Sequence, residues 1–329
     1  MPENSQYNPV VSIFTLTFNQ EAYVGQCIES VLAQEYTNWE MIILDDGSTD
    51  NTWGIIQGYT IRDGRIKSQR RDNKGIFAMA EAYNLMLSQS SGELIAILDG
   101  DDLWPSNKLS TQTVFHFNQG FDFTFGVCVT IEANTLKLSG IIPSKGDRSR
   151  IGLIEAKGGL SNEYLRGSFP ISAVTCMIHR SYLIKINGFT QPIYLPTTDY
   201  PTWVNVLATD CKAHFIDLEL GFWRIQAGQT TWKRAREMAL GMLRYSQEFA
   251  GETNETAVMS TGRQNFISDS LYRHALYNLN QRNFNEVRIA LSGLVKFKGY
   301  RYIFKFVAAL CIRIARSTWL SMFKLKISA

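Results

Sequence analysis

The strongest constraint on the fold is an alternation of two hydrophobic periods along the first hundred residues. Short, β-branched apolar runs predict strands over 10–16, 41–44 and 94–98. Apolar residues at helical spacing predict helices over 22–32, from about 49–52 onward, and over 78–87. Strands that are apolar on both faces and separated by helices are typical of βαβ units. We therefore predict an α/β fold with a mostly parallel sheet flanked by helices.

The remainder of the chain shows weaker patterns. Strands are expected over 121–129, 173–179 and 213–223, and a helix over 202–208. Residues 138–167 are rich in Gly, Lys and Ser without a firm period, so we expect a long functional loop or a small inserted subdomain there. From Lys233 onward, apolar residues suit a helical appendage. The expected organisation is one domain over 1–232 and a helical C-terminal region over 233–329.

Charge is distributed unevenly along the chain. The formal net charge is +3, but from Arg288 to the end there are nine Lys or Arg and no Asp or Glu, so the remainder carries 3 − 9 = −6. Five widely spaced cysteines form no CxxC pair, which indicates neither a disulfide framework nor a zinc site. The first residues lack both a basic leader and an apolar stretch, so we expect a cytoplasmic protein.

The basic C-terminal tail over 300–325 mixes aromatic and aliphatic residues with Lys and Arg. Its longest unbroken apolar run, 306–312, is seven residues, far below the ~20 needed to span a bilayer. Two interpretations stay open. The tail forms a basic amphipathic helix on an anionic membrane surface, or it packs on the body with a solvated basic face.

Two acidic clusters follow predicted inner strands, where open parallel sheets bind their ligands. Asp45 and Asp46 come after the second strand, and Asp99, Asp101 and Asp102 come after the strand ending at residue 98. Helix caps and turns also use Asp, but two such clusters favour a ligand or a metal. Hard carboxylate oxygens suit Mg²⁺ or Mn²⁺ together with substrate phosphates, and a cation relieves the repulsion between them. The intervening glycine is expected to permit a tight turn.

Several other chemistries lack their motifs in this chain. There is no GxxxxGK followed by Ser or Thr, no GxGxxG after the first strand, no GxSxG and no HExxH. The four histidines form no close pair, so each is expected to be structural or exposed. Basic residues near the C-terminus accompany no recognised nucleic-acid motif, so nucleic acid is not an expected partner.

Several motifs in order resemble a known family. They are VSIFTLTFNQEAYVGQCIESVLAQEYTNWEMIILDDGSTDNT, then NKG, then SGELIAILDGDD. This order closely resembles the N-terminal half of family 2 inverting glycosyltransferases with the GT-A fold, of the bacterial surface-polysaccharide type. A weaker similarity continues through AVTCMIHRSYLIKINGF, TTDYPTWVNV and FWRIQAGQTT, so it covers about residues 9–232. The resemblance implies a Rossmann-like mixed sheet, with a nucleotide-sugar-binding half over 1–115 and an acceptor-binding half over 116–232.

The resemblance also implies roles for residues near the first two strands. The backbone near Thr17 and the carboxylate of Asp46 would hold the nucleotide base, with Asp45 in support. Asn19 lies in the same motif and is assigned to donor binding as well.

The remaining implied roles fall on four aspartates. Asp101 would face the ribose or the diphosphate, and Asp102 would ligate the metal that bridges the donor phosphates. Asp99 would orient these groups or contact the donor sugar. Asp199 occupies the place of the catalytic base.

The chain departs from the family pattern at three places. Thr198 stands before the base where the family often has Glu, and Tyr83 stands where Ala-Arg-Asn would supply a donor-contacting arginine. Residues 229–232 do not match the QxxRW of processive members, so we expect one sugar per encounter.

The activity implied by the resemblance is that of a metal-dependent, inverting, non-processive glycosyltransferase. It would use Mn²⁺ or Mg²⁺ to move a sugar from a nucleotide-diphosphate donor to a glycan or lipid-linked acceptor in polysaccharide biosynthesis. The tail would then contact the inner face of the cell membrane. Two other classes stay open on the residues alone, namely a nucleotidyltransferase and a non-catalytic sugar-nucleotide-binding module.

Overall fold

The computed structural model describes residues 8–226, 229–251 and 258–310. The chain divides into two compact units, Met1–Gln226 and Ala227–Ala329. The functional boundary expected at residue 232 stays a prediction.

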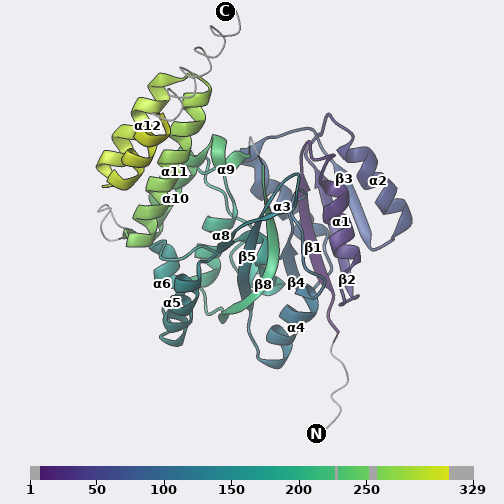
Figure 1. Ribbon diagram of the computed structural model, residues 1–329. Coiled ribbons are helices and arrows are strands. Elements are labelled where there is room, and N and C mark those ends of the chain that lie inside the picture. Colours follow the sequence, from purple (N-terminus) through teal and green to yellow (C-terminus); the bar gives the residue numbers. More distant parts are fainter. Residues whose placement is uncertain (1–7, 227–228, 252–257, 311–329) are drawn as a thin grey trace, which may run out of the picture. The chain divides into compact units, whose positions relative to one another are not determined.

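The first unit is an α/β domain (Figure 1). Its strands are β1 (Val11–Thr17), β2 (Trp39–Asp45), β3 (Ile66–Arg70), β4 (Leu94–Ile97), β5 (Phe123–Glu132), β6 (Leu138–Ile142), β7 (Met177–His179) and β8 (Ala213–Ile225). Its α-helices are α1 (Val24–Leu32), α2 (Thr52–Arg62), α3 (Met79–Gln89), α4 (Lys108–Asn118), α5 (Lys145–Ala156), α6 (Leu160–Leu165), α7 (Arg180–Lys185) and α8 (Asp199–Leu207). Two 3₁₀ turns, Ile76–Ala78 and Ala173–Thr175, complete it.

One mixed sheet joins these strands. Strands β3, β2, β1 and β4 are neighbours in that order, and all of them pair in parallel. Strand β7 pairs antiparallel with both β4 and β5, while β8 runs parallel to β5 along its other edge. The predicted mixed, mostly parallel sheet flanked by helices is therefore confirmed.

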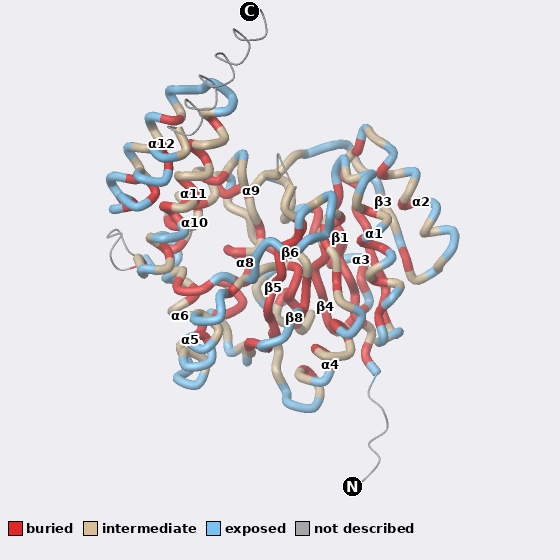
Figure 2. The backbone as a smooth tube through the Cα atoms, in the orientation of Figure 1, coloured by how far each residue is buried: buried red, intermediate tan, exposed pale blue. Residues whose placement is uncertain are grey.

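Both faces of β1, β2 and β4 are buried, as their apolar runs predict (Figure 2). Val11 and Ile13 of β1 belong to a core that they share with α1, α2 and α4. Phe14, which points to the opposite face, lies 6.3 Å from the ring of Phe189. Helix α3 contacts β1 on the sheet as well. Helices therefore cover the sheet on both faces and leave its carboxyl edge for other uses.

Two parts of this unit differ from the simplest sequence expectation. Of the two alternatives for residues 138–167, the long loop was wrong, and the segment forms β6, α5 and α6, as a small inserted subdomain requires. Strand β6 is exposed along its length, and α5 has one buried residue, Ile151, so neither carries a strong apolar period. Strand β3, with the polar sequence IKSQR, was missed because it forms an edge of the sheet.

The second unit is helical, as predicted for the appendage. It contains α9 (Thr230–Lys233), α10 (Ala235–Ala250), α11 (Thr261–Asn280) and α12 (Phe284–Lys296), and residues 300–310 are also helical. Leu243, Ile267, Leu271 and Leu294 form part of its buried core. Among the residues that the structure describes, no helix has both the length and the apolar character needed to cross a bilayer. Of the tail expected over 300–325, residues from 311 on lie outside the described part.

A lysine is fully buried in the first unit. Lys108, at the start of α4, is 0% exposed, and its Nζ lies 4.2 Å from the centre of the Trp104 ring. The amine donates to the side chain of Gln112 and, at 3.4 Å, to the backbone carbonyl of Cys176. Burial lowers the pKa of Lys108 from 10.5 to about 7, because the charged form loses its hydration.

This lysine makes stability depend on pH. Its pKa is lower in the folded chain, so between pH 7 and 10.5 the unfolded chain binds more protons and stability rises with pH. The slope approaches about 1.4 kcal/mol per pH unit for one proton. Urea unfolding of the wild type and of Lys108→Met, followed between pH 7 and 8.5, should show the wild type gaining stability relative to the variant. Parallel profiles would contradict this assignment, and Lys157→Met, at an exposed position, is the control.

Candidate active site

The parallel register brings the ends of separate strands to one edge of the sheet. Thr17 of β1 pairs with Asp45 of β2, and the next amide, Asp46 N, donates to Thr17 O at 2.9 Å. On the other side of β1, Gly100 N donates to Leu16 O at 3.2 Å. The two acidic clusters therefore flank the end of β1, as the sequence predicts.

Asp45 and Asp46 are both compensated by neighbouring arginines. Asp45 is fully buried and accepts from the backbone N–H and the hydroxyl of Ser48, and Arg70 Nε lies 3.1 Å from its carboxylate. Asp46, 6% exposed, pairs with Arg71. A polar cavity of about 590 Å³ opens beside these arginines, and it is lined by Gly47, Arg70, Arg71, Asp72 and Asn73.

Asn19 connects two loops of this edge. It is exposed and has a left-handed backbone, with φ of 52°. Its backbone N–H donates to Ser48 Oγ at 2.9 Å, and its side-chain Oδ1 accepts from Thr49 N at 2.7 Å. The loop after β1 is thus tied to the loop after β2, which holds Asp45 and Asp46.

The glycine within the second acidic cluster is required by close packing. A Cβ at Gly100 would lie 2.4 Å from Gln20 Oε1 and 2.9 Å from Thr17 Cβ. The expected tight turn is present, since Asp102 N donates to Asp99 O at 3.0 Å across Gly100 and Asp101. The φ of Gly100 is not positive, so the glycine is needed for space against the loop after β1 rather than for the turn itself.

Asp99 lies in a half-buried position and has a phenol as its partner. Tyr83 Oη donates to Asp99 Oδ1 at 2.5 Å. Burial raises the pKa of Asp99 to about 7; the Tyr83 hydrogen bond opposes this shift, and the charges of Asp101 and Asp199 add to it. Tyr83 was expected only as the replacement of a family arginine, and its bond to Asp99 was not foreseen.

Asp101 and Asp102 are fixed by the last strand of the sheet. Asp102 is 6% exposed, and its Oδ1 accepts from the backbone N–H of Arg224 in β8 at 3.0 Å. Gln226 Nε2 donates to Asp101 Oδ2 at 2.9 Å. Burial, followed by the charges of Asp101 and Asp99, raises the pKa of Asp102 well above its usual range.

Arg224 is a buried anchor that sequence reasoning missed. It is 1% exposed, and its guanidinium donates to Asp101 O at 2.7 Å, to Ala133 O at 2.9 Å and to Gln26 Oε1 at 2.8 Å. It also lies 4.8 Å from the centre of the Tyr23 ring. A single arginine inside the otherwise apolar stretch FWRI was the available signal.

Asp199 is the first residue of α8. Its Oδ1 accepts from the hydroxyl of Thr197 and, at 2.9 Å, from the backbone N–H of Tyr200. Burial raises its pKa, and these two hydrogen bonds partly oppose the shift. Because the charge of Asp199 raises the pKa of Asp99, the two carboxylates lie within electrostatic reach of each other although they are far apart in the sequence.

An aromatic stack connects these two carboxylates. The Tyr83 ring stacks on Phe189 with centroids 5.0 Å apart, and Phe189 meets the edge of Trp203 at 6.4 Å. Trp203 lies one turn into α8, the helix that begins at Asp199. The position of each carboxylate is thus tied to the same buried rings.

The carboxylate cluster fits a divalent cation. Within the described residues, no group of three or more His, Cys, Asp or Glu is arranged to hold a metal by itself. Asp101 and Asp102 nevertheless supply hard oxygens, and burial, followed by repulsion from Asp101, raises the pKa of Asp102. Mg²⁺ is commonly bound by one or two carboxylates plus substrate phosphates, which this donor set matches.

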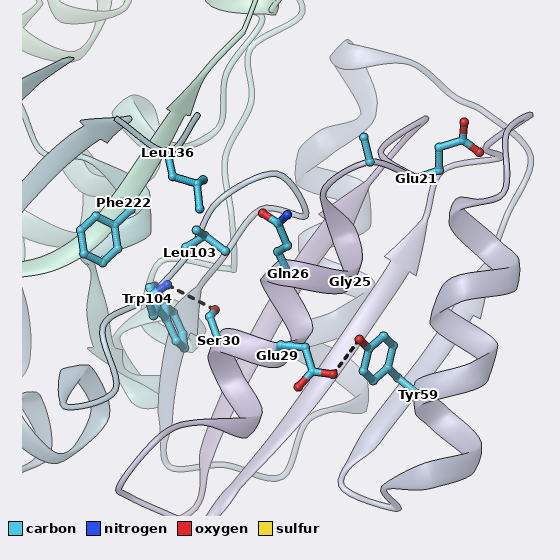
Figure 3. Close-up of a pocket in the computed structure, with 11 residues that line it drawn as sticks. Glu21, Gly25, Gln26, Glu29, Ser30, Tyr59, Leu103, Trp104, Leu136 and Phe222 are labelled. Atoms are coloured by element: carbon cyan, nitrogen blue, oxygen red, sulfur yellow. Dashed lines mark hydrogen bonds between the residues drawn. The ribbon is translucent and has the colours of Figure 1, made fainter. Parts of the chain in front are cut away.

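A second, more apolar pocket of about 570 Å³ lies beside α1 and contains none of the predicted site residues (Figure 3). Leu103, Trp104, Leu136 and Phe222 supply its apolar wall. Gln26, which accepts from Arg224, also lines it, so the pocket lies behind the Asp101 and Asp102 loop.

Comparison with known proteins decides the family. The model of the family described as "Glycosyl transferase family 2" matches residues 12–184. The chain belongs to glycosyl transferase family 2. The residues alone left a nucleotidyltransferase and a binding module open, and family membership answers that question in favour of the glycosyltransferase.

Three known proteins illustrate the similarity. The UDP-Glc:α-D-GlcNAc-diphosphoundecaprenol β-1,3-glucosyltransferase WfaP of Escherichia coli is 29% identical over 229 residues, which cover 70% of this chain and 82% of WfaP. The structure of S. aureus TarS 1–349 with UDP-GlcNAc is 17% identical, with a TM-score of 0.58, over 87% of this chain and 80% of that one. The Pyrobaculum calidifontis mannosyltransferase PcManGT with GDP-Man and Mn²⁺ is 14% identical, with a TM-score of 0.60, over 94% and 87%. The predicted GT-A fold is confirmed.

The anchor role of Arg224 can be tested by its effect on folding. Arg224→Met should lower the free energy of unfolding by about 1.5–3 kcal/mol, because the buried guanidinium and its hydrogen bonds to Asp101 O, Ala133 O and Gln26 Oε1 are lost. Lys185→Met, which breaks an exposed ion pair with Asp210, should cost much less, because solvent screens that pair. Chemical denaturation of both variants measures the difference, and equal stabilities would contradict the anchor role.

Proposed function

We propose that this family 2 glycosyltransferase is a metal-dependent, inverting, non-processive enzyme. It transfers a sugar from a nucleotide-diphosphate donor to a hydroxyl of a glycan or lipid-linked acceptor in bacterial polysaccharide biosynthesis. The observation that carries the proposal is the position of Asp199 at the start of α8, a helix that packs through Trp203 and Phe189 on Tyr83, whose phenol donates to Asp99. This arrangement supports a base near the strand-end cluster that suits donor phosphates.

The nucleotide base would bind beside Asp46, the Thr17 backbone and the polar cavity at Arg71. Asp46 is already held by Arg71, so it offers an ordered carboxylate edge to a base. Asp45 has its oxygens engaged by Ser48 and Arg70, which suits the supporting role. Asn19 would act by joining the two loops that border the base. The donor half is assigned to residues 1–115.

The metal would be held by Asp102, with Asp101 beside it at the donor. A bound Mn²⁺ or Mg²⁺ would supply positive charge to the departing diphosphate. PcManGT, which shares the fold, is described with GDP-Man and Mn²⁺. Arg224 would keep this loop in place, since its guanidinium donates to the Asp101 carbonyl and its backbone N–H donates to Asp102.

Asp199 would accept the proton of the attacking hydroxyl. In an inverting displacement the acceptor oxygen attacks the anomeric carbon from the face opposite the leaving diphosphate, so one base suffices. The raised pKa of Asp199 makes its carboxylate a stronger base than an ordinary aspartate. The Thr197 hydroxyl and the Tyr200 amide orient it. The acceptor half is assigned to residues 116–232.

The acceptor class is supported by a relative. WfaP is named for transfer of glucose from UDP-Glc to a diphosphoundecaprenol-linked GlcNAc. A lipid-linked acceptor of this kind would bring the present enzyme to the inner face of the cell membrane.

Replacing the proposed base separates chemistry from binding. Asp199→Asn should lower the transfer rate by about 10²–10⁴-fold while donor affinity stays close to that of the wild type. Single-turnover transfer and calorimetric titration with UDP-sugars measure the two quantities. Asp210→Asn, at an exposed aspartate, is the control. Transfer by Asp199→Asn at the wild-type rate would refute the mechanism.

Replacing the proposed metal ligand tests the donor site. Asp102→Asn keeps an oxygen to accept from Arg224 N, so the fold should survive, whereas one negative ligand is lost. Binding of UDP, GDP and dTDP, titrated with and without Mn²⁺, should lose its Mn²⁺-dependent part by at least about tenfold. The same Mn²⁺ dependence in wild type and variant would remove Asp102 from the metal site.

The Tyr83 hydrogen bond provides a third test. Tyr83→Phe removes the donor to Asp99 and should lower kcat/KM about tenfold or more, because a hydrogen bond to a charged group contributes about 1.5–3 kcal/mol. Tyr59→Phe removes a similar bond, from its phenol to Glu29, outside the acidic clusters and serves as the matched control. Equal rates for both variants would show that Tyr83 has no role in transfer.

A further inference from the structure

The helix over 300–310 has two apolar faces. Tyr302 and Phe306, four residues apart, are buried at 6% and 4% exposure and pack in the core of the second unit. Tyr300, Phe304 and Val307 are 53%, 75% and 50% exposed. Residues four and seven positions apart share a helix face, so these three form one stripe, which we name the exposed stripe. A helix that only covers its own core needs one apolar face, so the second has a different use.

Basic residues accompany the exposed stripe. Lys298, Arg301 and Lys305 are exposed, and the last two fall on one flank of the stripe at 3.6 residues per turn. The guanidinium of Arg301 and the amine of Lys305 lie 4.8 and 5.2 Å from the ring centre of Tyr302, and Arg301 also donates to Asn265 Oδ1 and Tyr302 Oη. From Arg288 to the end the sequence has nine Lys or Arg and no acidic residue. The stripe therefore lies within a segment of one charge sign.

We propose that the exposed stripe and its basic flank are a docking surface for an anionic phospholipid bilayer. Aromatic and aliphatic side chains enter the boundary between headgroups and acyl chains, and Lys and Arg remain at the phosphates. Each basic residue near an anionic surface adds about 1 kcal/mol, so the charge complements a bilayer. Four further basic residues, at 313, 316, 324 and 326, continue the same sequence pattern.

The charge of this surface favours a bilayer over a second copy of this chain. The same positive charge on two identical surfaces would repel across a symmetric contact. Bilayer binding goes beyond the proposed transfer reaction, since it needs neither donor nor acceptor.

The test uses the full chain and vesicles of phosphatidylcholine, with or without phosphatidylglycerol. The wild type should float with the anionic vesicles, and raising the salt concentration should release it. The double variant Phe304→Ser, Val307→Ser should lower the partition coefficient at least about tenfold, because two side chains no longer enter the bilayer. Phe284→Ser, at a phenylalanine 66% exposed on α12, is the matched control and should bind as the wild type does.

The outcomes separate this proposal from its alternatives. Unchanged flotation of the double variant would overturn it, and so would a wild type that binds no anionic vesicles. A wild-type dimer that the double variant converts to a monomer, without vesicle binding, would show that the stripe pairs two copies. Asp199→Asn should float as the wild type does, so failure of the proposed catalysis and failure of bilayer docking are distinguishable.

Discussion

Repulsion between clustered carboxylates is the constraint around which this domain is arranged. Parallel pairing of β1, β2 and β4 delivers several aspartates to one edge of the sheet. At the end of β2, two arginines neighbour the carboxylates of Asp45 and Asp46. At the end of β4, Asp99 accepts a hydrogen bond from the neutral phenol of Tyr83, and Asp102 accepts one from the backbone N–H of Arg224. The pKa of each of these two carboxyls is raised. The first cluster is compensated by two arginines, whereas at the second the charge of Arg224 only partly offsets the raised pKa of Asp102, so the proposed cation would lower the repulsion there.

The sheet and the position of the acidic clusters could be predicted from the sequence for a simple physical reason. Strands buried on both faces carry continuous apolar runs, and the first polar residues after such runs lie at the strand ends. Asp45, Asp46 and Asp99 follow this rule directly. Asp199 follows no such run, and only the family resemblance suggested it. Its electrostatic influence on Asp99 depends on how α8 packs against the sheet.

The features that could not be predicted depend on long-range contacts. Arg224 meets the Asp101 loop across more than a hundred residues, and an arginine in a strand is by itself expected to be exposed. Strand β3 and helix α5 bury too few side chains for their sequences to show a hydrophobic period. Gly100 is fixed by the approach of the loop after β1, which no local pattern encodes.

The stacked rings of Tyr83, Phe189 and Trp203 belong to the core, and they also connect Asp99 with the helix that carries Asp199. The side chain of Phe189 carries no polar atom, yet its ring separates the partner of Asp99 from the helix that begins at Asp199. A change of volume at Phe189 would therefore displace both carboxylates together. Because the three rings are in contact, the effects of substitutions at them are expected to be coupled rather than additive.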